Sequence, residues 1–159
     1  MKTEKCWLTA ALILCAASLI MMTLVCGKTE KQEVHFIPPP FEENACAGIP
    51  EVPEDDPYGK VDAKVFSFSL CPPDKIQDGK ARIFLTNPPD SPVWIKLRAL
   101  DSQGAILGET GILRPGEYTE YLSFSAVPKE GEDLYLKVMA YEPETYYSAG
   151  SVQLTIHGS

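Results

Sequence analysis

The stretch LYLKVMAY at residues 134–141 carries an apolar side chain at every second position. The same alternation recurs in VWIKLRAL at 93–100, KARIFLT at 80–86 and SVQLTIH at 151–157. A period of two is typical of a β-strand that buries one face and leaves the other in water. The side chains expected to face inward are Phe66, Phe68, Leu70, Ala81, Ile83, Leu85, Val93, Ile95, Leu97, Ala99, Leu134, Leu136, Val138, Ala140, Val152, Leu154 and Ile156.

Seven strands are expected in the C-terminal part of the chain. Segments rich in Pro, Gly, Asp and Asn separate them, such as Asp101–Gly104, which suits a tight hairpin, and Arg114–Gly116, which suits a type II turn. Helical periodicity is absent, so no helix is expected there. Because one half-buried sheet cannot hide so many apolar side chains, two sheets must face each other in an antiparallel sandwich. The expected strands are 61–71, 80–86, 93–100, 105–109, 117–125, 134–141 and 151–157.

The N-terminus has the character of a membrane segment. After a short tail at residues 1–6, residues 7–26 contain no charged side chain, and 20 residues match the thickness of the hydrocarbon core of a bilayer. An uncleaved transmembrane anchor is therefore favoured over a cleaved signal peptide or a lipid attached to Cys26. A short tail before a long folded part favours a single-pass protein with its C-terminal domain outside the cytoplasm.

Residues 27–60 are acidic and rich in proline, a composition that favours an extended stalk leading to the folded domain at 61–159. The formal net charge of −8 opposes binding to nucleic acid. In the stalk and domain the only cysteines are Cys46 and Cys71, and the sequence leaves open whether they form a disulfide or remain two free thiols.

The sequence contains few motifs typical of catalytic or metal-binding sites. The two histidines, His35 and His157, lie in the expected stalk and near the C-terminus, so neither suits a catalytic dyad or triad. Neither a nucleophile motif nor a phosphate-binding glycine loop occurs, and no Cys and His spacing is typical of a metal site. The sequence therefore favours a protein without enzymatic activity, cofactor or metal.

The outward phase of the strands at 93–100 and 134–141 is the candidate binding patch. Aromatic and basic side chains interleave there, and such a surface suits an anionic or carbohydrate ligand or a partner protein. The alternative is that the stalk or the loop at 146–148 lies over these side chains. The candidate residues are Trp94, Lys96, Arg98, Tyr135, Lys137 and Tyr141.

About 100 residues, seven short strands and a Trp on the third strand resemble the immunoglobulin-like sandwich, in its broad bacterial form because the inter-sheet cysteine pair of antibodies is missing. With its anchor and stalk, the chain also looks like small uncharacterised membrane-anchored surface proteins of Gram-positive bacteria. The leading hypothesis is a membrane-tethered binding or adhesion module whose partner is another protein or a cell-envelope component. The alternatives are a structural subunit of a secretion or conjugative transfer assembly and a carbohydrate-binding domain.

Overall fold

Two compact units make up the chain, residues 1–37 and residues 38–159. The computed structural model describes residues 36–129 and 131–158, so only Phe36 and Ile37 of the first unit are described, and both are exposed. None of the described segments is a helix of the length and apolar character needed to cross a bilayer. The predicted anchor at 7–26 lies outside the described residues.

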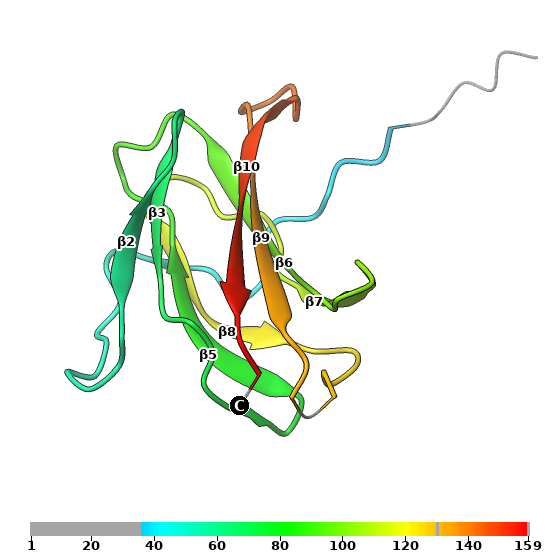
Figure 1. Cartoon of the computed structure of the whole chain (residues 1–159). Coiled ribbons are helices and arrows are strands. Elements are labelled where there is room, and N and C mark those ends of the chain that lie inside the picture. Colours follow the sequence, from blue (N-terminus) through cyan, green and yellow to red (C-terminus); the bar gives the residue numbers. More distant parts are fainter. Residues whose placement is uncertain (1–35, 130, 159) are drawn as a thin grey trace, which may run out of the picture. The chain divides into compact units, whose positions relative to one another are not determined.

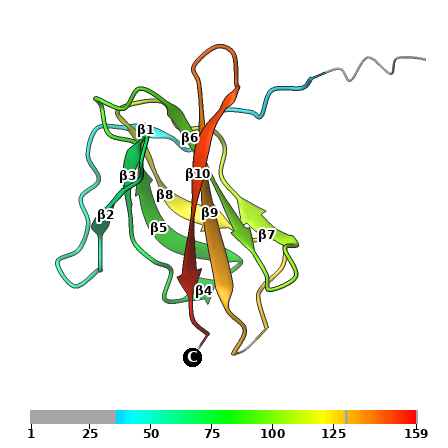
Figure 2. The same ribbon diagram turned by 45° about the horizontal axis from the view of Figure 1, so that its top comes forward.

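The second unit is all-β, with no helix among its described residues, as the sequence predicts. Its strands are β1 (Cys46–Ala47), β2 (Gly59–Asp62), β3 (Ser67–Leu70), β4 (Ile76–Gln77), β5 (Lys80–Thr86), β6 (Trp94–Leu100), β7 (Ile106–Glu109), β8 (Glu117–Ser123), β9 (Leu134–Tyr141) and β10 (Ser148–Ile156) (Figure 1). They form two antiparallel sheets. The first sheet has the order β1-β8-β5-β3-β2, with β4 also paired to β5, and the second has the order β10-β9-β6-β7. Figure 2 shows the two sheets as separate layers.

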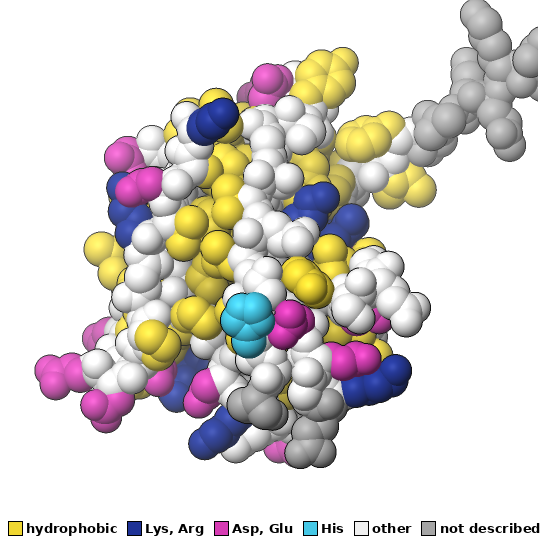
Figure 3. All heavy atoms as spheres, viewed as in Figure 1, with side chains coloured by type: hydrophobic (Ala, Val, Ile, Leu, Met, Phe, Trp, Pro, Cys, Tyr) yellow, Lys and Arg dark blue, Asp and Glu magenta, His cyan; other side chains and the backbone are white. Residues whose placement is uncertain are grey.

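The core lies between the two sheets and confirms the predicted inward phase. The side chains of β3, β5, β6 and β9 assigned to the interior are almost completely buried, among them Phe68, Ile83, Leu97 and Leu136. The apolar side chains of β10 pack against this core but stay partly exposed. Hydrophobic surface is accordingly visible along β10 (Figure 3).

Two of the predicted turns are present in the structure. At Arg114-Pro115-Gly116-Glu117 the amide of Glu117 donates to the carbonyl of Arg114 over 3.1 Å, and Gly116 has a φ of +79°. This is the geometry of the predicted type II turn, which needs a residue tolerant of positive φ at its third position. The Asp101 carboxylate accepts from the amides of Gln103 and Ala105, which closes the hairpin between β6 and β7.

The strand predicted at 61–71 is two strands, β2 and β3, paired to each other as an antiparallel hairpin. The amide of Ala63 donates to the carbonyl of Phe66 over 2.9 Å and closes the connection. The apolar series changes phase here, from odd positions ending at Val65 to even positions beginning at Phe66. Since one strand cannot bury both phases on the same face, the chain reverses at this point.

The predicted stalk at 27–60 differs from the structure over residues 38–60, which belong to the folded unit. Phe41 forms a parallel bridge with Ile112, and β1 pairs with β8. Proline removes a donor but keeps its carbonyl, and the carbonyl of Pro40 accepts from the amide of Ile112 over 2.9 Å. The segment 38–47 therefore runs from the second sheet to the first, and we call it the strap.

Close approach of the strap requires a glycine at position 111. A Cβ atom at Gly111 would overlap with the backbone of Phe41 and Glu42. We predict that Gly111→Ala lowers the free energy of unfolding by about 2 kcal/mol, because backbone atoms must shift to admit the methyl group. Denaturant unfolding of the intact chain measures the change. A matched variant, Gly59→Ala, meets no atom within 4 Å and should leave stability nearly unchanged; equal unfolding midpoints for both variants would contradict the close packing of the strap.

Candidate functional site

The candidate residues come together on the outer surface of the second sheet, where β6 and β9 are neighbours. Across the two strands Trp94 is paired with Tyr141, Lys96 with Met139 and Arg98 with Lys137, while Tyr135 is paired with Leu100. Directly opposed side chains on one sheet face lie within contact distance. We call this surface the β6–β9 face, made of Trp94, Lys96, Arg98, Tyr135, Lys137, Met139 and Tyr141.

Trp94 is covered on this face by two aromatic side chains. Its ring meets Phe41 of the strap edge to face, with centroids 5.0 Å apart, and meets Tyr146 in a second edge-to-face contact at 5.3 Å. The guanidinium of Arg114 lies 3.7 Å from the centre of the Phe41 ring, a cation–π contact that also holds the strap. The strap and the loop after β9 thus both lie over the indole, as the alternative interpretation of the sequence proposed.

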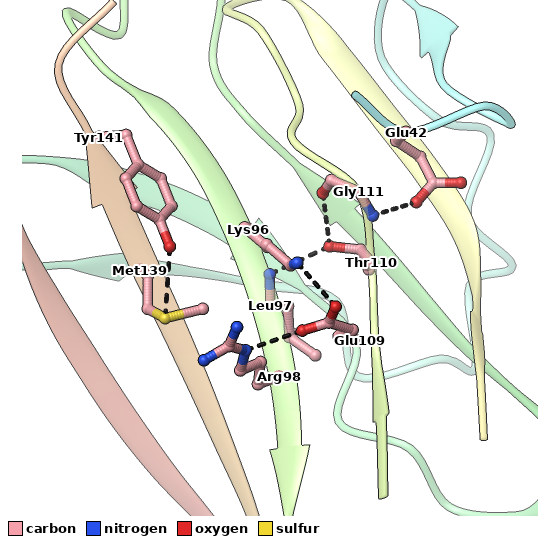
Figure 4. A network of polar contacts seen from close by, with 9 residues as sticks. All are labelled: Glu42, Lys96, Leu97, Arg98, Glu109, Thr110, Gly111, Met139 and Tyr141. Carbon is pink, nitrogen blue, oxygen red and sulfur yellow. Dashed lines mark hydrogen bonds and ion pairs between the residues drawn. The ribbon is translucent and has the colours of Figure 1, made fainter. Parts of the chain in front are cut away.

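Lys96 is buried although it belongs to the outward phase of β6. Only 3% of its side chain is exposed, and its Nζ lies 2.9 Å from Oε1 of Glu109 on β7. The second oxygen of Glu109 accepts from Nε of Arg98 over 2.8 Å, so one carboxylate neutralises part of two cations (Figure 4). Lys96 is therefore a structural cation rather than an accessible ligand contact.

The strap is fixed beside this ion pair. Oε2 of Glu42 accepts from the amide of Gly111 over 2.6 Å, and Oγ1 of Thr110 accepts from the amide of Leu97 over 3.0 Å (Figure 4). Residues 40–44, Lys96 and 109–111 line one shallow hollow at this position. The hollow is thus formed largely by the strap itself.

The electrostatics of Glu109 follow from its two cationic neighbours. Partial burial acts to raise the pKa of this carboxyl, but the hydrogen bonds from Lys96 and Arg98 outweigh it and hold the pKa below the ordinary value of 4.5. The carboxylate therefore stays charged at neutral pH and keeps the buried ammonium of Lys96 paired.

What remains accessible on the β6–β9 face is the end away from Trp94. Tyr135, Lys137 and Arg98 are half-buried, and the exposed side chains of Gln153 and Thr155 on β10 extend the same surface, being paired with Lys137 and Tyr135. Lys137 forms no ion pair within residues 36–129 and 131–158. Beside Arg98 it leaves an excess of positive charge between aromatic rings, in a chain of net charge −8.

The sequence offered the stalk and the loop at 146–148 as segments that cover this surface, but it did not predict the contacts of Phe41, Glu42 and Glu109. Glu109 had a usable signal, because a hairpin at 101–104 pairs the strand ends and sets a carboxylate opposite Arg98. Phe41 had no such signal, since it does not belong to an alternating strand. Tyr146 adopts a φ of +58°, a conformation uncommon for a non-glycine residue, while it packs on Trp94.

Cys46 and Cys71 are free thiols in the structure, which decides the alternative that the sequence left open. Cys46 is exposed in β1, whereas Cys71 is buried and its amide donates to the carbonyl of Ile83 on β5. Because β8 and β5 lie between β1 and Cys71, the two residues are separated by about three strand spacings, or roughly 14 Å. A disulfide needs Cα atoms within about 7 Å.

The other groups considered in the sequence lie apart from this face. Nδ1 of His157 is 3.1 Å from a carboxylate oxygen of Asp133, and His35 lies outside the described residues. Within the described part of the chain no three His, Cys, Asp or Glu side chains are grouped to hold a metal ion. Comparison with protein-family models, with characterised proteins and with solved structures gives no match.

We predict that Glu109→Gln weakens the fold by leaving the buried ammonium of Lys96 without its anion. The loss should be about 1–2 kcal/mol, less than for a fully buried pair because 40% of the Glu109 side chain is exposed. A carboxyl with a lowered pKa stabilises the fold above pH 4.5 and loses this effect as the pH falls through that pKa. Glu109→Gln should therefore flatten the fall in stability between about pH 5 and pH 3.

The measurement is denaturant unfolding of the intact chain at several pH values. Asp62→Asn, which removes the exposed partner of Lys60, is the control and should change the neutral-pH stability little. If Asp62→Asn and Glu109→Gln behave alike, the ion pair of Lys96 does not hold the outer face of β6 and β7 together.

The cysteines should differ sharply in reactivity. Burial is the main cause that raises the pKa of the Cys71 thiol, which lowers its thiolate fraction as well as its access to reagents. We expect a maleimide to modify Cys46 in the folded protein more than about 100-fold faster than Cys71, and both at similar rates in denaturant. Peptide mapping by mass spectrometry reads this out, and a disulfide-linked peptide joining Cys46 to Cys71 would contradict the structure.

Proposed function

We propose that this protein is a non-enzymatic binding module, tethered to a membrane by residues 7–26 with its sandwich outside the cytoplasm. In this proposal the accessible part of the β6–β9 face binds an anionic group carried by another protein or by a cell-envelope component. The observation that carries the proposal is the uncompensated Lys137 next to Arg98, flanked by Tyr135, on a strongly acidic chain. Lys137 and Arg98 are directly opposed on neighbouring strands and form a cationic pair, and a guanidinium can hold a carboxylate or phosphate through two parallel bonds.

The immunoglobulin-like class belongs to the same proposal, and the strand order supports it. The order β10-β9-β6-β7 corresponds to strands G, F, C and C′ of immunoglobulin-like domains, and β3-β5-β8 corresponds to A, B and E. The position that strand D takes beside strand E is occupied by β1 of the strap.

Net charge gives the proposed contact its specificity. A chain of net charge −8 repels anionic partners over most of its surface, so a local excess of cations selects both the site and the orientation of approach. Tyr135 and Tyr141 add apolar area whose rotamers are already restricted by half-burial. Stacking of a carbohydrate requires an open Trp94 ring, and the contacts of Phe41 and Tyr146 with that ring favour an anionic partner instead.

We test the proposal by photocrosslinking from the intact chain in its native membrane. A benzophenone side chain replaces Tyr135 in one variant and Tyr121 in another; Tyr121 is 48% exposed but lies on β8 of the other sheet. We expect a discrete adduct from position 135 alone. Adding Lys137→Glu should reduce its yield about tenfold, which corresponds to about 1.4 kcal/mol of binding free energy.

The matched control reverses the charge of an exposed lysine elsewhere. Lys129→Glu changes the net charge by the same amount on the loop before β9 and should leave the adduct intact. Raising the salt concentration should weaken the adduct from position 135, because screening acts on exposed charges. Loss of the adduct with Lys129→Glu to the same degree, or equal adducts from positions 121 and 135, would refute a role for the β6–β9 face.

A further inference from the structure

The open edges of the two sheets are protected to very different degrees. In the first sheet β1 has only two residues, and β2 has four and carries the charged pair Lys60 and Asp62. In the second sheet β7 pairs with β6 on the side away from β9, and the strap adds a parallel bridge between Phe41 and Ile112, which follows β7. Short strands, charged side chains and covering segments are the means by which proteins prevent unwanted strand pairing.

The strand β10 has none of these protections along most of its length. It has nine residues, SAGSVQLTI, without a charged side chain or a proline, and a single irregularity between Ser148 and Gly150. Within the described residues only β9 pairs with it, so one side of its backbone is left open. A long, uncharged open edge is a template for another strand.

The side chains of β10 are suited to continue both faces of the sheet. Val152, Leu154 and Ile156 point toward the core yet stay partly exposed at its margin, while Ser151, Gln153 and Thr155 are exposed on the opposite face. Figure 3 shows hydrophobic surface lying along this margin. A strand added at this edge would cover the apolar margin as well as pair the open backbone groups.

We propose that β10 pairs with β10 of a second copy of this protein, antiparallel and about a two-fold axis, which joins the two second sheets into one. A two-fold axis perpendicular to the sheet presents the same edge of both copies to each other and makes the two strands antiparallel. With the axis perpendicular to the sheet, the apolar row of each copy stays on the core side. The order of the joined sheet is then β7-β6-β9-β10 followed by β10-β9-β6-β7.

The charge distribution favours a second copy of this chain as the partner of the open β10 edge. Two chains of net charge −8 repel each other over most surfaces, and β10 is the long edge that carries no charge. Lys64 lies next to Val65, which approaches Gly150 near the start of β10, whereas Asp133 contacts His157 at its end. Antiparallel pairing brings the Lys64 end of each copy toward the Asp133 end of the other, which sets opposite charges at both ends of the paired strands. Lys64 has no ion-pair partner within its own described chain.

The joined sheet would set two β6–β9 faces side by side on one surface. A partner that offers two anionic groups would then meet both faces at once, and its apparent affinity would rise without new contacts. The pairing of β10 does not depend on the proposed function, since it rests on the edge strand and not on Lys137.

The test is a charge swap on the exposed side of β10. The intact chain in detergent is compared with the double variant Gln153→Glu and Thr155→Glu, and with the double variant Gln153→Lys and Thr155→Lys. Sedimentation velocity over a concentration series gives the dimer dissociation constant. We expect a dimer for the unchanged chain and at least about a tenfold weaker dimer for each variant alone, because like charges then oppose each other across the axis.

An equimolar mixture of the acidic and the basic variant should recover the dimer, which excludes misfolding as the cause of its loss. The matched control places two glutamates on other exposed positions, Ser102→Glu and Ser123→Glu, and should dimerise like the unchanged chain. Circular dichroism checks that every variant keeps its sheet content. A monomeric unchanged chain, or a dimer indifferent to all the changes on β10, would overturn the proposal, as would capture of an extended foreign segment by β10 of a monomer.

Discussion

The burial of two apolar sheet faces against each other is the constraint on which the rest of this structure depends. Ile95, Leu97 and Ala99 on β6 and the matching series on β9 are almost entirely excluded from water. Their strict alternation leaves no choice for the residues between them, which must point outward. The cations and aromatic rings of the β6–β9 face therefore occupy their positions because the core residues occupy theirs.

The outer face is then modified by segments that do not follow the alternation. The strap brings Phe41 against Trp94, Tyr146 closes on the same indole, and Glu109 draws Lys96 into a buried ion pair. The two aromatic contacts join residues far apart in the chain, whereas Glu109 meets Lys96 across the β6–β7 hairpin. They convert a surface that the strand pattern makes uniformly cationic and aromatic into one that is closed near Trp94 and open near Lys137.

Alternation predicted the interior and the main strands because it is a local property of each segment. The inward phase of Ile83, Val93 and Leu134 could be assigned without any tertiary information, and the two-sheet arrangement followed from it. The strap could not be foreseen, since its pairing uses carbonyls that proline retains and a gap at Gly111 that only the folded chain reveals. The reversal at Val65 and Phe66 was readable as a change of phase. The free thiols required knowledge of how many strands lie between Cys46 and Cys71.

The route of the strap also determines how the domain responds to mechanical load. A pull on the backbone at Pro38 is borne first by three hydrogen bonds, which join Pro40 to Ile112, Glu42 to Ile112 and Glu42 to Gly111. These contacts lie at the margin of the sheet, so they can break in succession while the sandwich behind them stays closed. Their rupture draws Phe41 away from the indole of Trp94, so that Tyr146 alone lies against that ring at the Tyr141 end of the face. Tension along the chain and the composition of its outer face are thereby coupled.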